Sequence, residues 1–114
     1  MLRTALTGAS GFLGGHTARA LLRENCSVTA LLRSSSSADN LPEDCEVFRV
    51  NFMDPCSMEE GLHGAEVIIH CAGATSAGSQ EKFDRINALF TRNLLAARDM
   101  FADKALFIYI SSQA

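Results

Sequence analysis

The sequence predicts an α/β protein with a doubly wound parallel sheet of the Rossmann type, and two observations support this prediction. Short apolar segments alternate with amphipathic ones in the order β-α-β-β-α-β-α-β. The apolar segments lack a polar alternation, which is typical of strands that are buried on both faces of a parallel sheet. Because crossovers between parallel strands are right-handed, we expect the strand order 3-2-1-4-5 with helices on both faces.

The first three elements follow from local patterns. Leu2–Thr7 is short and apolar and precedes glycines, so it is predicted to be a buried strand. Phe12–Glu24 has apolar residues at helical spacing, and Ser27–Leu32 is a second apolar strand. A polar loop with four consecutive serines follows the second strand.

The second half of the chain continues the alternation. Strands are predicted at Glu46–Val50, Glu66–Cys71 and Ala105–Ile110. A short helix is expected from Asp54-Pro55 to about Leu62, because Asp is a good N-cap and Pro fits the first helical turn. Glu81–Ala102 is expected to be a long amphipathic helix, with one apolar face formed by Phe83, Ile86, Phe90, Leu94, Ala97 and Phe101.

Size and composition limit the classes of protein that the chain can represent. Its 114 residues suit one domain, and 47% apolar with 20% charged residues is ordinary for a soluble globular protein. The net charge is −3 and no two basic residues are adjacent, which argues against a nucleic-acid surface. No segment approaches the ~20 apolar residues of a membrane helix, and the start lacks a signal-peptide pattern. We therefore expect a cytoplasmic protein with no nucleic-acid or membrane partner.

The four cysteines give no sign of a site. Cys26, Cys45, Cys56 and Cys71 are widely spaced, and none forms a C-x-x-C pair. Small buried side chains in a reducing compartment are the favoured interpretation, with a disulfide framework or a metal site as the alternative. We predict no metal site.

The stretch "TGASGFLGG" lies at the first predicted turn from strand to helix. Gly8, Gly11 and Gly14 recur every three residues, whereas the usual dinucleotide fingerprint is G-x-G-x-x-G. Gly8 would permit a sharp turn, Gly11 a close approach of backbone to phosphate, and Gly14 close contact between helix and strand. The start of the following helix supplies free N–H groups for an anion. The alternative is a glycine-rich turn without a ligand.

Five motifs follow one another along the whole chain. The first is "TGASGFLGGH", and the others are "VNFMDP" at Val50–Pro55, "HCAG" at His70–Gly73, "INALFTRNLLAA" at Ile86–Ala97 and "FIYISSQA" at Phe107–Ala114. Together and in this order they resemble the extended branch of the short-chain dehydrogenases/reductases, the NAD(P)-dependent epimerase/dehydratase family, whose signature T-G-x-x-G-x-x-G the first motif matches.

The resemblance implies roles for residues along a dinucleotide. The pyrophosphate would lie against the backbone of Ser10, Gly11, Phe12 and Leu13. Asn51 stands where the family usually has an Asp that bonds the adenine amino group, and Phe52 would flank the adenine. The alternative for Asn51 is a loop residue that bonds its own backbone.

At the other end of the dinucleotide, the resemblance implies that Ala72, Gly73 and Ala74 pass close to the nicotinamide ribose. Asn87 matches a helix Asn that faces the active site, with an exposed or locally bonded Asn as the alternative. His70 ends a strand beside the cofactor site, and its counterpart in the family is usually structural.

The choice of cofactor depends on Arg33. NAD-binding proteins usually place an acidic residue at the end of the second strand, where it holds the ribose hydroxyls. Here Leu32 is followed by Arg33 and then by serines, so no carboxylate repels a 2′-phosphate and a guanidinium is available to pair with one. We therefore favour NADP over NAD. A solvated loop arginine is the alternative.

The resemblance implies hydride transfer with a Ser, a Tyr and a Lys four residues after that Tyr. Ser112 matches the Ser, with Ser111 as the alternative. The Tyr-x-x-x-Lys motif is absent, because the only tyrosine is Tyr109 and Gln113 stands four residues later. We expect residues 1–114 to be an incomplete NAD(P)-binding domain at the N-terminal end of a longer oxidoreductase or epimerase/dehydratase, inactive by itself.

Two other classes of protein are alternatives to the enzyme. One is a non-catalytic, NADP-binding regulatory or scaffold protein with a Rossmann fold, and the other is a nucleotide-free flavodoxin-like protein. The small-molecule substrate of the longer protein is not encoded in these residues.

In the family the fifth strand is covered by a sixth, so Ala105–Ile110 is expected to be an apolar sheet edge through which the chain self-associates.

Overall fold

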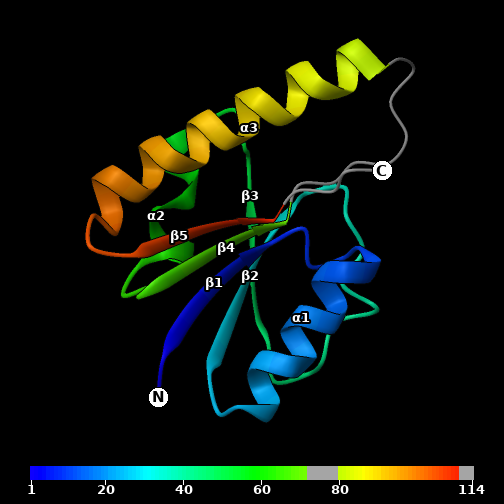
Figure 1. The fold of residues 1–114 in the computed structure, drawn as a ribbon, viewed down its shortest axis with the longest axis vertical. Helices are drawn as coiled ribbons and strands as arrows, with labels where there is room; N and C mark the ends of the chain where they lie inside the picture. The colour runs from blue at the N-terminus through cyan, green and yellow to red at the C-terminus, as the bar shows by residue number, and fades with distance from the viewer. Residues whose placement is uncertain (72–79, 111–114) are drawn as a thin grey trace.

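The computed structural model describes residues 1–71 and 80–110, which form five strands and the helices between them (Figure 1). The strands are β1 (Arg3–Thr7), β2 (Ser27–Arg33), β3 (Glu46–Val50), β4 (Val67–Cys71) and β5 (Leu106–Ile110). The helices are α1 (Phe12–Arg23), the 3₁₀-helix η1 (Pro55–Met58), α2 (Glu59–Leu62) and α3 (Gln80–Phe101).

All neighbouring strands are parallel, in the order β3-β2-β1-β4-β5, which confirms the predicted topology. At the centre of the sheet, Leu6 of β1 lies between Ala30 of β2 and Ile69 of β4. The chain leaves β1 toward β2 on one side and returns to β4 on the other. The carboxyl ends of β1 and β4 therefore form the switch point where doubly wound sheets bind ligands.

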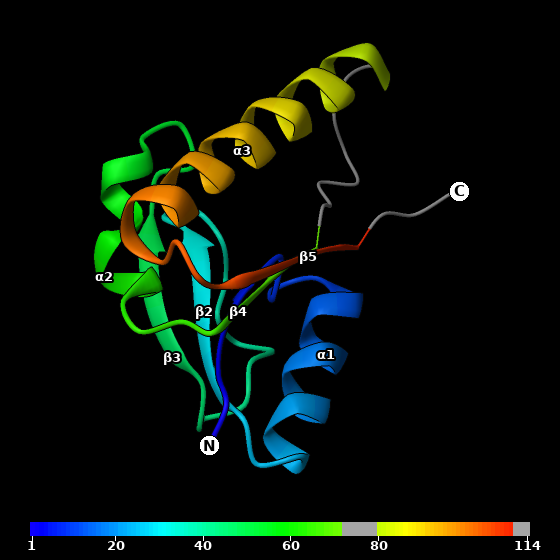
Figure 2. The ribbon, with the colours of Figure 1, turned by 60° about the vertical axis from the view of Figure 1, so that its left-hand side comes forward.

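Helices cover both faces of the sheet. Figure 2 shows α1 on one face and α2 with α3 on the other. The first core lies beneath α2 and α3 and includes Leu31, Met58, Ile68 and Leu94. The second core lies beneath α1 and its buried members are Leu6, Ala9, Ala18, Val28, Ala30, Leu32, Cys45, Ile69 and Cys71. The strands need apolar residues on both faces because each face meets one of these cores.

The region after β3 differs in detail from the expected short helix. The chain first makes the tight helix η1 and then a single turn of α2. The Asp54 side chain accepts a hydrogen bond from the Cys56 backbone N–H at 3.1 Å, so Asp54 is the expected N-cap. Pro55 occupies the first helical position, where a missing N–H costs no hydrogen bond.

Three apolar residues anchor the serine-rich loop between β2 and β3, although the loop is mostly polar. Ala38 and Leu41 pack against the second core, and Cys45 is part of it. Arg19 of α1 also donates a hydrogen bond to the Asn40 carbonyl at 2.9 Å. This loop therefore extends the cover that α1 provides over the sheet.

The two edges of the sheet differ in their exposed side chains. On β5, Leu106 is 61% exposed, and Ile108 and Tyr109 are also exposed. On β3, by contrast, charged Glu46 and Arg49 are exposed. Charged residues on an edge strand oppose pairing with other chains, so only the β3 edge carries this protection. In the part of the chain that the structure describes, no helix is long and apolar enough to cross a membrane.

Adjacent leucines of α3 provide a test of the first core. Leu94 is fully buried, whereas Leu95 is 40% exposed. We predict that Leu94→Ala lowers the free energy of unfolding by about 3 kcal/mol, because it removes buried methyl groups and leaves a cavity. Leu95→Ala should change it by less than about 1 kcal/mol. Urea denaturation measures both, and equal losses would contradict the placement of α3.

Candidate functional site

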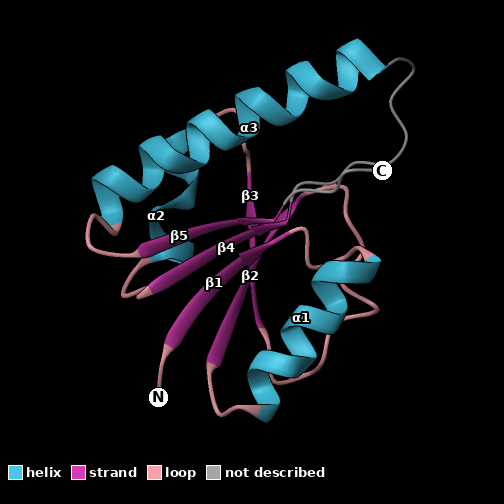
Figure 3. Ribbon diagram, in the orientation of Figure 1, coloured by secondary structure: helices cyan, strands magenta, loops and turns pink. Residues whose placement is uncertain are grey.

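A pocket of about 530 Å³ opens at the carboxyl ends of β1, β2 and β4. Figure 3 shows these strand ends converging beside the start of α1. The sequence-predicted residues that line the pocket are Gly8, Ser10, Gly11, Phe12, Leu13, Gly14, Arg33, Phe52 and Asn87. Ala72, Gly73, Ala74 and Ser112 lie outside the described residues.

The turn after β1 requires glycine at its first position. Gly8 has φ +71°, in the left-handed region that glycine adopts at low cost. A Cβ built on Gly8 would lie 2.3 Å from the Cys71 carbonyl oxygen of the neighbouring strand β4. No side chain fits there, so the turn can pass directly over the end of β4.

A second close approach joins α1 to the same turn. A Cβ on Gly14 would lie 2.0 Å from the Gly8 carbonyl oxygen, so the first turn of α1 packs against the turn backbone. The Gly11 N–H also donates to the Gly8 carbonyl at 3.1 Å. The start of the helix is therefore fixed against the end of β1.

The start of α1 is open to an anion. Gly11 is the N-cap, and it provides no side-chain hydrogen bond; the first turn also has no acidic residue. The first backbone N–H groups of a helix lack intrahelical acceptors, and the helix dipole makes this end positive. The arrangement therefore fits a phosphate, which would accept from these N–H groups.

Arg33 stands at the end of β2, and the backbone that follows it is held by another arginine. The Ser36 N–H donates to the Arg33 carbonyl at 3.1 Å, which closes a turn. Arg49 of β3 donates from Nη1 to the same Arg33 carbonyl at 2.9 Å and also to the Ser36 carbonyl. Sequence reasoning missed Arg49, whose relation to this turn depends on the pairing of β2 with β3.

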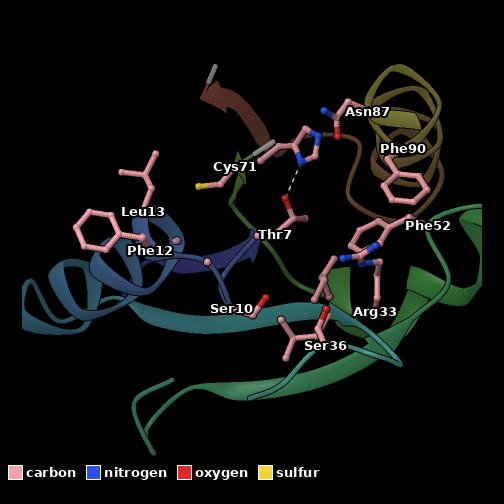
Figure 4. A pocket seen from close by; sticks show the side chains of 16 residues that line it. Thr7, Ser10, Phe12, Leu13, Arg33, Ser36, Phe52, Cys71, Asn87 and Phe90 are labelled. Atoms are coloured by element: carbon pink, nitrogen blue, oxygen red, sulfur yellow. Dashed lines mark hydrogen bonds between the residues drawn. The ribbon is translucent and has the colours of Figure 1, made fainter. Parts of the chain in front are cut away.

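A smaller hollow of about 280 Å³ lies next to the pocket and shares Arg33, Phe52 and Phe90 with it. It is also bordered by Ser34, Ser35, Val50 and Asn51. The rings of Phe52 and Phe90 lie 5.5 Å apart with 31° between their planes. Figure 4 shows this pair of rings beside Arg33. The hollow is therefore lined by two aromatic rings, the Arg33 guanidinium and the hydroxyl groups of Ser34 and Ser35.

The bottom of the pocket contains a chain of hydrogen bonds through His70. Its Nδ1 lies 2.5 Å from the Thr7 hydroxyl, and its Nε2 lies 2.9 Å from the Thr91 hydroxyl (Figure 4 draws the first). Thr91 in turn donates to the Asn87 carbonyl at 2.8 Å. Three elements, β1, β4 and α3, are connected in this way.

The donor and acceptor of each hydrogen bond in this network follow from the last bond, in which Thr91 donates to the Asn87 carbonyl. Because the Thr91 hydroxyl proton is donated to Asn87, its oxygen must accept from His70 Nε2–H. The proton of the neutral ring is then on Nε2, so Nδ1 accepts from the Thr7 hydroxyl. His70 is only 5% exposed, and burial lowers its pKa to about 4. The ring is therefore neutral at physiological pH.

Thr7 and Thr91 are the members of this hydrogen-bond network that sequence reasoning did not identify. Each is an ordinary threonine in a strand or a helix, and 84 positions separate them in the sequence. Only the parallel pairing of β1 with β4 brings Thr7 opposite His70. The one available signal was the histidine itself, because both of its ring nitrogens need hydrogen-bond partners when it lies inside a fold.

Two of the four cysteines match the interpretation of small buried side chains, whereas Cys26 is half-buried and Cys56 is exposed. All four are free, and Cys45 and Cys71 are buried. Burial raises the pKa of the Cys71 thiol, which lines the pocket. Within residues 1–71 and 80–110, no group of three His, Cys, Asp or Glu side chains is placed to hold a metal ion.

Comparison with known proteins gives a family match over nearly the whole chain. Residues 4–114 match the profile of the NAD dependent epimerase/dehydratase family. The chain is 33% identical over 116 residues to 4-hydroxy-2-methyl-3-oxo-4-farnesyl-3,4-dihydroquinoline-1-oxide ketoreductase of Stigmatella aurantiaca, covering 99% of this chain and 34% of that protein. It is 36% identical over 111 residues to ceramide reductase of Caulobacter vibrioides, covering 96% of this chain and 34% of that protein.

Solved structures agree with this match. The crystal structure of gox2253 superimposes with a TM-score of 0.82 and 29% identity, covering 96% of this chain and 34% of the other. The chain thus spans about a third of the length of the proteins that it matches.

Because burial lowers the pKa of His70, we predict that the free energy of unfolding depends on pH. Its folded pKa of about 4 lies below the ordinary value of 6.5, so the unfolded chain binds the proton first as pH falls. The neutral His70 therefore stabilises the fold fully above pH 6.5. Between pH 6.5 and 4 this contribution is lost, and the free energy of unfolding falls by up to about 3 kcal/mol.

Urea denaturation at pH steps from 7.5 to 4 measures this loss in the wild type and in His70→Asn. The carboxylates titrate in both proteins, so their effect cancels in the difference between the two curves. We expect the difference to change between pH 6.5 and 4 and to be constant above that range. Parallel curves throughout would show that folding does not lower the pKa of His70.

Proposed function

The chain belongs to the NAD dependent epimerase/dehydratase family, and we propose that it is the cofactor-binding part of an NADP-dependent reductase within that family. Membership implies binding of a nicotinamide dinucleotide. The observation that carries the proposal is the start of α1, which lacks both a capping side chain and an acidic residue and opens into the pocket. Two curated relatives above 30% identity are a ketoreductase and a ceramide reductase, which favours reduction among the reactions of the family.

The described residues fit a dinucleotide. Pyrophosphate would accept hydrogen bonds from the first N–H groups of α1, near Gly11 and Phe12, where no side chain competes. The space beside Gly11 is open, since a Cβ there would meet only the Gly8 carbonyl oxygen at 3.4 Å. The pocket and the adjoining hollow together run from His70 to Asn51 along the carboxyl edge of the sheet.

A bound nicotinamide dinucleotide supplies the hydride that reduction requires. In this proposal Ser112 holds the substrate oxygen, and the Tyr and Lys of the family's proton-transfer site are contributed from outside these residues. His70 stays neutral and connects β1 to α3 beside the nicotinamide end. Asn87 lines the same end of the pocket, with its carbonyl held by Thr91.

The preference for NADP over NAD rests on charge. Arg33 and Ser36 line the pocket, and Arg33, Ser34 and Ser35 line the adjoining hollow. Among the described residues that border the two cavities, none is Asp or Glu. A 2′-phosphate therefore meets a guanidinium and hydroxyl donors without a repelling carboxylate.

Fluorescence titration with NADPH and with NADH tests this proposal. We expect NADPH to bind more tightly than NADH, and Arg33→Ala to weaken NADPH by about tenfold while changing NADH little, because only NADPH has the 2′-phosphate. Arg23→Ala is the control, since Arg23 is at the far end of α1. Unchanged NADPH binding by Arg33→Ala would refute the NADP assignment.

Absence of binding by either dinucleotide would favour the nucleotide-free class of α/β protein. If NADPH binds and the longer reading frame lacks Tyr-x-x-x-Lys, the non-catalytic regulatory or scaffold function would replace the reductase.

We also propose that this chain self-associates through β5. The strand is at the edge of the sheet, its five residues are "LFIYI", and three of them are exposed. Its unpaired backbone groups can extend the sheet into a second copy. The other edge, β3, carries Glu46 and Arg49 and is less suited to such pairing.

Sedimentation velocity over a range of protein concentrations tests this association. We predict that the 114-residue chain forms dimers or larger species, and that Leu106→Lys shifts it to monomer because a charge on the edge opposes pairing. Val47→Lys on β3 is the matched control and should leave the distribution unchanged. A wild-type chain that remains monomeric at high concentration would rule out pairing through β5.

A further inference from the structure

The side chain of Asn51 has a fixed orientation at the border of the smaller hollow. Its Oδ1 accepts a hydrogen bond from the Met53 backbone N–H at 2.9 Å. An N–H group can be satisfied only by an acceptor, so the amide oxygen, and not its nitrogen, must point toward Met53. The Nδ2 group is then on the other branch of the side chain, and among residues 1–71 and 80–110 no acceptor for it is observed.

The backbone around Asn51 is held rigidly. The Asn51 N–H donates to the Ser57 hydroxyl at 2.9 Å, and the Asn51 carbonyl accepts from the Asp54 N–H at 2.9 Å. The next residue, Phe52, has its carbonyl held by the buried side chain of Asn93 at 2.9 Å. These bonds join the loop to η1 and to α3, so the Asn51 amide is presented from a fixed support.

The position of this amide suits contact with a nucleotide base. With pyrophosphate at the start of α1 and a ribose phosphate at Arg33, the hollow that continues from Arg33 to the end of β3 is available for the base. The hollow at that place is bordered by Asn51, Phe52 and Phe90. Aromatic rings favour contact with a planar base, and Asn51 is the amide side chain at this border, with its N–H donors not used by the bond to Met53.

We propose that Asn51 presents an N–H donor to the 6-position of the bound purine, so that the site accepts a 6-oxopurine dinucleotide at least as well as an adenine dinucleotide. This inference rests on the proposed function, because it requires that a dinucleotide binds in the pocket. It concerns which base the site accepts, which the choice between NADP and NAD leaves open.

The chemistry of the two bases explains the expected preference. Adenine carries an amino donor at C6, and an N–H donor opposite it forms no hydrogen bond. Hypoxanthine carries a carbonyl acceptor at C6, which can accept from Asn51 Nδ2. A donor left without a partner loses the solvation that it has in water, so the mismatch penalises adenine. An Asp at this position would keep one oxygen for Met53 and present the other as an acceptor for the adenine amino group.

The test compares NADPH with its hypoxanthine analogue, nicotinamide hypoxanthine dinucleotide phosphate, in fluorescence titrations of the wild type and of Asn51→Asp. In the wild type we expect the analogue to bind within threefold of NADPH or more tightly. In Asn51→Asp we expect the ratio of affinities to move toward NADPH by at least about tenfold, the effect of one charge-assisted hydrogen bond.

Each other outcome contradicts the inference in a recognisable way. A wild-type preference for NADPH above threefold overturns the assignment of Asn51. A shift of the affinity ratio by less than about tenfold in Asn51→Asp overturns it as well. In both cases the proposed function survives. If neither dinucleotide binds the wild type, the proposed function fails and this inference fails with it. Circular dichroism of Asn51→Asp verifies that the variant is folded, and Asn51→Ala, which has neither group, should show a ratio between those of wild type and Asn51→Asp.

Discussion

The contact between the turn after β1 and the end of β4 determines how the rest of the structure is arranged. Gly8 lies so close to the Cys71 carbonyl oxygen that no Cβ fits between them, and Gly14 approaches the Gly8 carbonyl in the same way. These two approaches bring a strand, a turn and a helix start into direct backbone contact. The helix can then direct its first N–H groups across the carboxyl edge of the sheet, which is where the pocket opens.

The sequence predicted the elements well because their signals are local. Apolar segments flanked by glycine, proline or polar residues gave all five strands within one or two residues of their ends, and the order of elements gave the sheet order. Glycine spacing located the pocket for the same reason, since the turn is contiguous in the chain. Asp54 was identified as a cap because a cap bonds to a residue two positions away.

The residues that sequence reasoning missed act across long separations. Thr7 meets His70 through strand pairing, and Arg49 holds the backbone of Arg33 through the pairing of β2 with β3. Leu41 carries no periodic signal in a polar loop, yet it packs against the second core. For Asn51, the residue type left open which amide group bonds the local backbone, and the bond from the Met53 N–H assigns the oxygen to that contact.

The uncapped start of α1 also has a consequence for how long the protein survives in a cell. A helix whose first N–H groups are satisfied by water gains stability when an anion takes the place of that water. A ligand present at a hundred times its dissociation constant stabilises the folded state by about 2.7 kcal/mol. The unfolded fraction that proteases degrade falls accordingly, so the abundance of such a protein follows the supply of the molecule that it binds.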